Sequence, residues 1–209
     1  MNEAIAVEPQ PLCGSIQTER HPLKPFLPAG SKVLMLGSFP PKRERWSMEF
    51  YYPNFQNDMW RIMGLIFFGD KLRFVDGPHK RFDCERVVDF CTAHGIAIFD
   101  TATAVRRLKD NAADKFLEVV EPTDVGALLR RLPECRAVAV TGEKAAETVL
   151  LSLGKHTDIY PKVGEYVEFE FDNRLMRLYR MPSSSRAYPL AVERKAEHYG
   201  RMFSQIGML

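Results

Sequence analysis

The chain has 209 residues, of which 45% are hydrophobic, and its 29 basic and 27 acidic side chains leave a net charge of +2. This length and apolar content suffice for one complete hydrophobic core, so we expect a single domain at residues 32–209 after an irregular, proline-rich extension at residues 1–31. The composition excludes a membrane-spanning protein, because no apolar run approaches the roughly 20 residues of a span, and no basic start with an apolar block precedes the domain.

Short apolar runs alternate with segments of helical spacing along the chain. In chain order, the sequence predicts a strand at 32–37, helices at 56–68 and 84–94, a strand at 96–99, a helix at 123–132, a strand at 137–140, a helix at 143–153, strands at 165–171 and 175–181, and a closing helix at 189–206. Gly95 is the expected C-cap of the second helix. This alternation predicts an α/β fold, with a parallel sheet covered by helices on both faces.

The cysteines and the charged clusters carry little functional information. Cys13, Cys84, Cys91 and Cys135 form no C-x-x-C pair, which argues against a zinc ribbon or an iron–sulfur cluster, so we expect neither a metal nor a cofactor. Cys84 and Cys91 are typical of core thiols in a reducing compartment, and we expect a monomeric, cytoplasmic protein. Basic residues cluster at 42–45, 80–81, 106–109, 130–131 and 174–186; a fold could gather them on one face, although each cluster alone is typical of solvated surface.

The segment after the first predicted strand is the first candidate for chemistry. The apolar run at residues 33–36 is followed by Gly37-Ser38-Phe39-Pro40-Pro41, and residues 50–57 combine aromatic rings with the amides of asparagine and glutamine. In open α/β sheets, ligands bind beyond the carboxyl ends of the strands. Flat aromatic faces beside neutral amides suit a flat heterocycle.

The segment after the last predicted strand is the second candidate. Met181-Pro182-Ser183-Ser184-Ser185-Arg186 places small hydroxyls and backbone N–H groups where they can approach a phosphodiester, with a cation at the end. The alternative is a plain serine-rich turn in which one serine is the N-cap of the closing helix. In the predicted architecture, this segment converges with residues 37–57, 100–111 and 141–143.

The order and spacing of these motifs resemble the uracil-DNA glycosylase superfamily, over residues 32 to 206. Gly37-Ser38-Phe39-Pro40, Phe50-Tyr51-Tyr52, Gln56-Asn57 and Trp60 are similar to its first motif, and most similar to the branch of hypoxanthine (deoxyinosine) and mismatch-specific uracil DNA glycosylases. Residues 181–185 are similar to the second motif of that branch, L-P-S-T-S, and residues 97–105 resemble the strand that ends in the base-reading residue. The resemblance implies a three-layer α/β/α fold around a mainly parallel four-stranded sheet.

The sequence departs from the family pattern at three places. Pro53-Asn54-Phe55 stands where relatives often carry Gly-His-Pro, and Asp58-Met59 replaces an Arg-Phe pair. The second motif continues as Arg186-Ala187-Tyr188 instead of Pro-Ala-Asn. These departures bear on the substrate and on activity itself.

The resemblance implies a DNA glycosylase that flips a deaminated base, hypoxanthine or uracil, out of DNA and hydrolyses its N-glycosidic bond. The superfamily's usual catalytic Asp or Asn position is Phe39 here, and the hypoxanthine branch moves the role to Asn57. The Asn57 amide could orient water or bind the departing base. The alternative is that Asn57 only caps the helix that follows it.

The resemblance also assigns base-binding residues. Tyr52 would stack on the flipped base, although core packing is the commoner fate of an aromatic ring. Asp100 stands where relatives that read uracil carry Asn; an ionised Asp can only accept a hydrogen bond, so a backbone N–H must supply any donor. Ser38 and Phe39 would supply such N–H groups. The alternative for Asp100 is an N-cap of a turn at Thr101.

The DNA contacts would come from Ser183, Ser184, Ser185 and Arg186, with Arg186 entering the minor groove or filling the gap left by the base. The alternative is that Arg186 is an ordinary charged residue at the rim. Two other classes stay open: a catalytically silent nucleic-acid-binding relative of the same fold, and a flavodoxin-like or nucleotide-binding protein using Thr141-Gly142-Glu143-Lys144. The second lacks both glycine-rich phosphate motifs.

Overall fold

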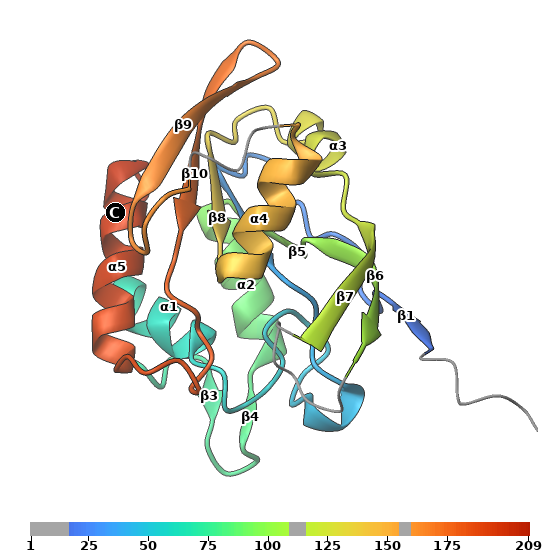
Figure 1. The fold of residues 1–209 in the computed structure, drawn as a ribbon. Coiled ribbons are helices and arrows are strands. Elements are labelled where there is room, and N and C mark those ends of the chain that lie inside the picture. The colour runs from blue at the N-terminus through green and yellow to red at the C-terminus, as the bar shows by residue number, and fades with distance from the viewer. Residues whose placement is uncertain (1–16, 109–115, 155–159) are drawn as a thin grey trace, which may run out of the picture.

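The computed structural model describes residues 17–108, 116–154 and 160–209. Its centre is a sheet with strand order β5-β2-β8-β10-β9 (Figure 1). Strands β2 (Val33–Gly37), β5 (Ile96–Asp100), β8 (Ala137–Val140) and β10 (Arg174–Arg180) run parallel, and β9 (Tyr166–Phe171) pairs antiparallel with β10. The predicted parallel sheet is confirmed, and its strands are the continuously apolar runs because both faces are covered.

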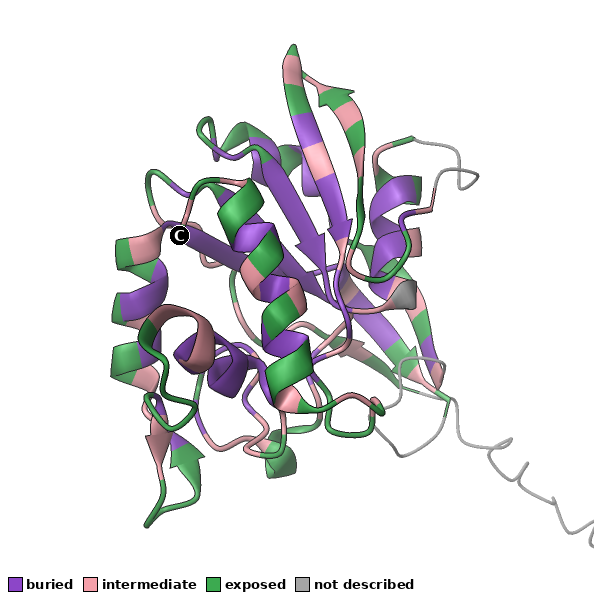
Figure 2. Cartoon of the chain, turned by 90° about the vertical axis from the view of Figure 1, so that its left-hand side faces the viewer, coloured by how far each residue is buried: buried purple, intermediate pink, exposed green. Residues whose placement is uncertain are grey.

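Helices cover both faces of this sheet. Helices α3 (Val125–Arg130) and α4 (Glu143–Ser152) lie on one face, and α1 (Met59–Phe68), α2 (Cys84–His94) and α5 (Val192–Gln205) lie on the other (Figure 1). Every residue of β2, β5 and β8 is buried between these layers, as Figure 2 shows. The three-layer α/β/α class predicted from the sequence is therefore the observed fold. Helix α2 has the predicted bounds and ends at Gly95 in the left-handed conformation, with φ 66°.

Two small sheets were not predicted. Strands β1 (Thr18–Arg20), β6 (Ala102–Arg107) and β7 (Leu117–Pro122) form an antiparallel sheet in the order β1-β6-β7. Strands β3 (Val75–Asp76) and β4 (Arg81–Phe82) form a hairpin, and a 3₁₀ turn, η1, spans Arg43–Arg45. These strands are short and partly exposed, so they lack the continuous apolar runs by which the others were recognised.

The prediction that residues 1–31 are irregular is corrected for the part that the structure describes. Thr18 to Arg20 pair with β6, and Phe26 exchanges two backbone hydrogen bonds with Ile98, with N···O distances of 3.0 and 2.9 Å. The physical reason is that β5 is the edge of the central sheet, so its outward backbone groups are free to bind another segment. Residues 17–31 are thereby fixed along the edge of the domain.

The cysteines of the described residues are free thiols inside the protein. Cys91 and Cys135 are buried and Cys84 is half-buried, and burial raises the pKa of the Cys135 thiol to about 11. Cys13 lies outside the described residues. None of the helices in the described part of the chain has the length and apolar character that a membrane crossing requires.

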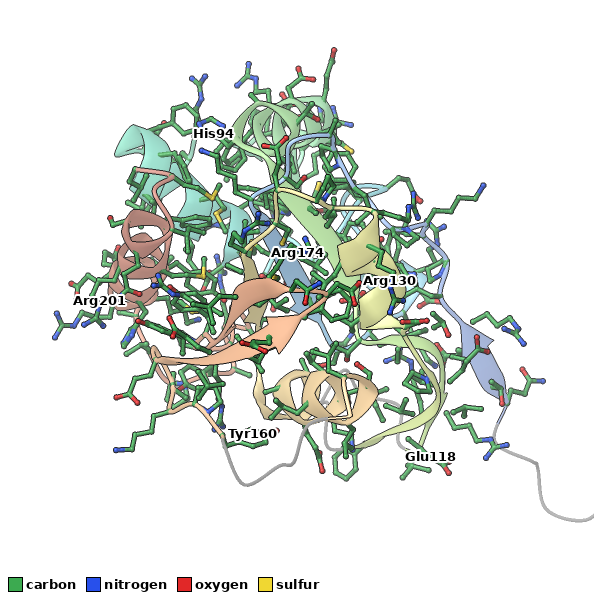
Figure 3. The ribbon with its side chains drawn as sticks, turned by 90° about the horizontal axis from the view of Figure 1, so that it is seen from above. His94, Glu118, Arg130, Tyr160, Arg174 and Arg201 are labelled. Carbon is green, nitrogen blue, oxygen red and sulfur yellow. The ribbon has the colours of Figure 1, made fainter. Side chains whose placement is uncertain are left out.

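The basic clusters are spread over the molecule. Arg174 donates to the carbonyl oxygens of Leu129 and Leu132 at 2.9 and 2.8 Å, and Arg130 pairs with Asp172 at 3.1 Å. Both arginines lie near the turn between β9 and β10, in the view of Figure 3 from above. They join this hairpin to α3. Because these arginines bind other parts of the protein, only some of the basic residues can face a ligand.

Candidate functional site

A cavity of about 630 Å³ lies beyond the carboxyl ends of the parallel strands. Its wall includes Gly37 at the end of β2, Asp100 at the end of β5 and Thr141 directly after β8. The other lining residues are Ser38 to Pro41, Arg45, Tyr51 to Asn54, Gln56, Asn57, Arg107 and Ser183 to Pro189. The segments that the sequence predicted to converge therefore surround one cavity.

The two sequence motifs are joined directly by backbone. Asn57 and Ser185 form an isolated antiparallel bridge, and the backbone N–H of Asp58 donates to the Ser184 carbonyl oxygen at 2.9 Å. The end of the first motif is thus held against the serine segment of the second.

A buried ion cluster fixes this junction. One Asp58 carboxylate oxygen accepts from Arg186 Nε at 3.1 Å and the other from Lys195 Nζ at 3.0 Å. Lys195 Nζ also donates to the Ser185 carbonyl oxygen at 2.9 Å. The Lys195 side chain is 0% exposed, whereas that of Arg186 is 51% exposed. Charges are rarely buried unless they are paired, so this cluster holds the serine segment in place.

Sequence reasoning missed both Asp58 and Lys195. Lys195 lies in the apolar stripe of α5, four residues before Tyr199 and seven before Met202, and all three side chains are buried. A lysine at such a position calls for a buried partner. The identity of that partner follows only from the fold.

Asn57 lies at the cavity wall and at the start of α1. Its Oδ1 accepts from the backbone N–H of Met59 at 2.9 Å, and its carbonyl oxygen accepts from Arg61 Nη1 at 3.0 Å. The helix begins at Met59, three residues after the predicted start, and its N-cap residue is Asp58, so Asn57 lies one residue before the cap and binds the first N–H of the helix. Since Asn57 also lines the cavity, its catalytic role stays a prediction.

Tyr52 combines exposure to the cavity with an unusual backbone. Its φ is 50°, in the left-handed region that side chains rarely adopt. The ring packs edge-on against Trp60, with 6.1 Å between the ring centroids, and its hydroxyl lies 3.5 Å from Thr141 Oγ1. Strained residues of this kind are concentrated at functional sites. Tyr52 is thus partly packed, and it also presents surface to the cavity.

Ser38 and Phe39 also line the cavity, as predicted for them. The Phe39 ring packs edge-on against His21 at 5.3 Å between centroids, and the Arg107 guanidinium lies 5.6 Å from the Phe39 centroid. Arg107 is bound to the Glu19 carboxylate at 2.9 Å and to the Pro40 carbonyl oxygen at 2.6 Å. Phe39 therefore occupies the position at which the resemblance would place a polar catalytic group, and its ring is packed against His21.

Asp100 is paired with a residue that the sequence did not indicate. Its Oδ2 lies 2.8 Å from His21 Nε2, and the side chains are only 9% and 3% exposed. The Asp100 backbone carbonyl accepts from Thr123 Oγ1 at 2.7 Å. The alternative was that Asp100 caps a turn at Thr101. In the structure its carboxylate binds His21 instead. The signal in the sequence is only a histidine in a proline-rich segment.

Tyr51 is a buried tyrosine beside this pair, with 6.1 Å between its ring centroid and that of His21. Burial raises the pKa of Tyr51, and the nearby Asp100 charge raises it further. Its hydroxyl donates to the Lys24 carbonyl oxygen at 2.8 Å. Tyr51 therefore helps to hold residues 17–31 against the site.

The serine segment is a turn closed by its own side chains. Ser183 Oγ accepts from the Ser185 N–H and Ser185 Oγ accepts from the Ala187 N–H, both at 3.2 Å, while Ser184 is buried. The prediction that one serine caps the closing helix is wrong, because the N-cap of α5 is Ala191. The physical reason is that these hydroxyls already bind backbone N–H groups within the turn.

Gly37 leaves room for the Asp100 carboxylate, which gives a first testable prediction. A Cβ at position 37 would overlap Asp100 Oδ1. We expect Gly37→Ala to lower the free energy of unfolding by about 1–3 kcal/mol through overpacking, measured by denaturant unfolding. Gly77→Ala is the control, because nothing lies within 4 Å of the added methyl group, and it should change stability by less than about 0.5 kcal/mol. Equal stability of the two variants would show that the carboxylate does not depend on the glycine.

The fold and the position of the cavity define the class of structure. The chain has a uracil-DNA-glycosylase-like fold, a three-layer α/β/α arrangement with a ligand cavity beyond the carboxyl ends of its parallel strands. It is similar to the solution NMR structure of a "putative uracil DNA glycosylase" from Methanosarcina acetivorans, with a TM-score of 0.61 and 21% sequence identity over 91% of this chain and 99% of that one. No protein-family model and no curated protein sequence matches the chain.

Proposed function

We propose that this protein is a DNA glycosylase that excises a deaminated base, hypoxanthine or uracil, from DNA. The observation that carries the proposal is the hydrogen-bonded junction of the two glycosylase-like motifs at one cavity. A volume of 630 Å³ is within the range of about 300–1,000 Å³ that small-ligand sites occupy. The fold of the Methanosarcina protein, and the activity that its description names, support the same reading.

The reaction needs a flipped base held at the cavity. Extrusion costs a few kcal/mol of stacking and pairing, and stacking on an aromatic ring returns roughly 1–3 kcal/mol per base. Tyr52 supplies a ring at the cavity wall, and its edge-on contact with Trp60 holds that ring in place. Tyr52 is therefore the proposed platform for the base.

Cleavage of the N-glycosidic bond leaves its electron pair on the departing base. Water forms the new bond to the sugar carbon and loses a proton to solvent, and the base anion takes up a proton from solvent. The transition state carries positive charge on the sugar and negative charge on the base, so fixed dipoles that stabilise both are effective. The Asn57 oxygen binds the Met59 N–H, and this contact orients the amide. Its NH₂ group is then the part that we assign to the departing base, and water is left to approach from the sugar side.

The serine turn and Arg186 are proposed to hold the DNA strand. Residues 183–188 form one rim of the cavity, and the ion cluster beneath them makes this rim rigid. Arg186 uses Nε for Asp58 and is half-exposed, which leaves guanidinium N–H groups on the DNA side. Small hydroxyls and one cation suit a phosphodiester.

A cleavage assay tests the proposal. Duplex and single-stranded oligonucleotides containing hypoxanthine, uracil or xanthine are incubated with excess protein, then treated with alkali and separated on a gel. We expect strand cleavage at hypoxanthine or uracil and none at the unmodified bases. The second candidate, a silent nucleic-acid binder, is favoured by Phe39 at the usual catalytic position; it predicts gel retardation of the same oligonucleotides without cleavage.

A further inference from the structure

His21 lies behind the cavity wall, where its side chain, only 3% exposed, contacts the lining residue Asp100. It is brought there by β1, which pairs with β6 so that the His21 backbone N–H donates to the Thr103 carbonyl oxygen at 2.8 Å. Its ring is packed against Phe39 and Phe99, at 5.3 and 4.7 Å between centroids. The imidazole is therefore fixed in position by backbone pairing and by aromatic contacts.

The surroundings of His21 determine which of its nitrogens carries a proton. Nδ1 lies 3.1 Å from the Leu23 backbone nitrogen and 2.9 Å from the Leu23 carbonyl oxygen. A neutral ring accepts from the Leu23 N–H and a charged ring donates to its carbonyl, and Nε2 carries a proton in both cases. The remaining tautomer would turn a bare Nε2 toward the Asp100 carboxylate, 2.8 Å away. We therefore assign the proton of this contact to His21 Nε2, with Asp100 as its acceptor.

This hydrogen bond restricts what Asp100 can do. Oδ2 contacts His21 Nε2, and Oδ1 lies at the place that a Cβ of residue 37 would need. Asp100 and Gly37 both line the cavity. His21 donates to Oδ2 in this arrangement, so the contact needs no proton on the carboxylate. An ionised carboxylate has no proton to donate. Asp100 is then an acceptor for a ligand and nothing else.

We propose that His21 is a positioning residue that holds Asp100 as the acceptor for a ring N–H, so that the site prefers hypoxanthine and uracil to adenine and cytosine, the bases from which they arise. This inference rests on the proposed glycosylase function. Deamination changes the edge of the base that carries this N–H: a bare ring nitrogen beside an amino group becomes a ring N–H beside a carbonyl. Hypoxanthine, xanthine and uracil carry the N–H that Asp100 accepts, whereas adenine and cytosine present a lone pair to the carboxylate. The neighbouring carbonyl of the base would accept from the backbone N–H groups predicted at Ser38 and Phe39.

Two variants separate the hydrogen bond from the packing. His21→Phe keeps a ring among the neighbouring aromatic side chains but removes the donor, and His21→Gln keeps an N–H that reaches toward Asp100. The two substrates are matched oligonucleotides with deoxyinosine, whose base has an N–H and a carbonyl, or deoxynebularine, whose purine has neither. Single-turnover rates are measured on both, with thermal unfolding as a check of the fold.

We expect His21→Phe to lower the rate on deoxyinosine by about 10- to 100-fold, the value of a hydrogen bond to a charged group, with a smaller change on deoxynebularine. The preference for deoxyinosine should therefore fall in His21→Phe and persist in His21→Gln. A purely structural role would lower both rates together in both variants and would overturn the proposal. An unchanged preference in a folded His21→Phe variant would overturn it as well.

A spectroscopic measurement keeps the inference testable without activity. In ¹⁵N NMR spectra of the unmodified protein, we expect His21 Nε2 to be protonated throughout the pH range in which the protein is folded. A bare Nε2 would overturn the assignment even if His21→Phe failed to fold. Absence of cleavage by the parent on every deaminated oligonucleotide, together with a protonated Nε2, would instead refute the glycosylase function and with it the base selection.

Discussion

Replacing Asn57 by alanine should lower the single-turnover excision rate by about 10²-fold or more, equivalent to roughly 2.7 kcal/mol in the barrier. The same variant should lose about 1 kcal/mol of stability, because the Met59 N–H at the start of α1 loses its bond to Asn57 Oδ1. Excision kinetics and denaturant unfolding of one protein preparation measure the two effects. DNA affinity should change little, since Asn57 is assigned to the departing base and not to the strand.

Asn57→Asp separates the two roles of this residue. Aspartate accepts the Met59 N–H as well as asparagine does, so stability should stay within about 0.5 kcal/mol of the parent. Its carboxylate has no N–H for the departing base and repels the negative charge that develops there. The rate should therefore fall at least as far as in Asn57→Ala. If Asn57→Asp is as stable and as active as the parent, Asn57 only binds the first N–H of α1 and has no part in the reaction.

Lys195→Met should lower the free energy of unfolding by about 3 kcal/mol, toward the lower end of the cost of breaking a buried ion pair. The substitution leaves the Asp58 carboxylate buried, although Arg186 still contacts it at 3.1 Å. It also removes the donor to the Ser185 carbonyl oxygen, so the serine turn should become mobile and the affinity for DNA should fall. Denaturant unfolding and gel retardation measure these two losses.

Arg186→Ala and a double variant are the matched controls for Lys195→Met. Arg186 is half-exposed, so its ion pair with Asp58 should contribute only about 1 kcal/mol or less. Combining Lys195→Met with Asp58→Asn removes the uncompensated charge and should recover much of the lost stability. If Lys195→Met is as stable as the parent, the ion cluster does not hold the junction of the two motifs.

Local sequence was sufficient for the framework of the domain. Runs such as residues 33–36 and 137–140 are apolar throughout because helices cover both faces of the sheet, so the pattern alone predicts buried parallel strands. Gly95 ends α2 in the left-handed conformation for a reason that is also local, the absence of a Cβ. The place of the cavity followed from the same framework, because the carboxyl ends of parallel strands meet at one edge of a sheet.

The partners inside the site depended on contacts between distant segments. Asp100 binds His21 across 79 positions of the chain and Asp58 binds Lys195 across 137, and no periodicity relates residues so far apart. The pairing of Thr18 with Arg106 could not be predicted for the same reason, because the strand edge to which β1 binds exists only after β6 has formed. A charged side chain or a histidine can lie in solvent or in the core, and the local sequence does not distinguish these two places. Burial makes a partner necessary, and the packing of the folded chain decides which side chain that partner is.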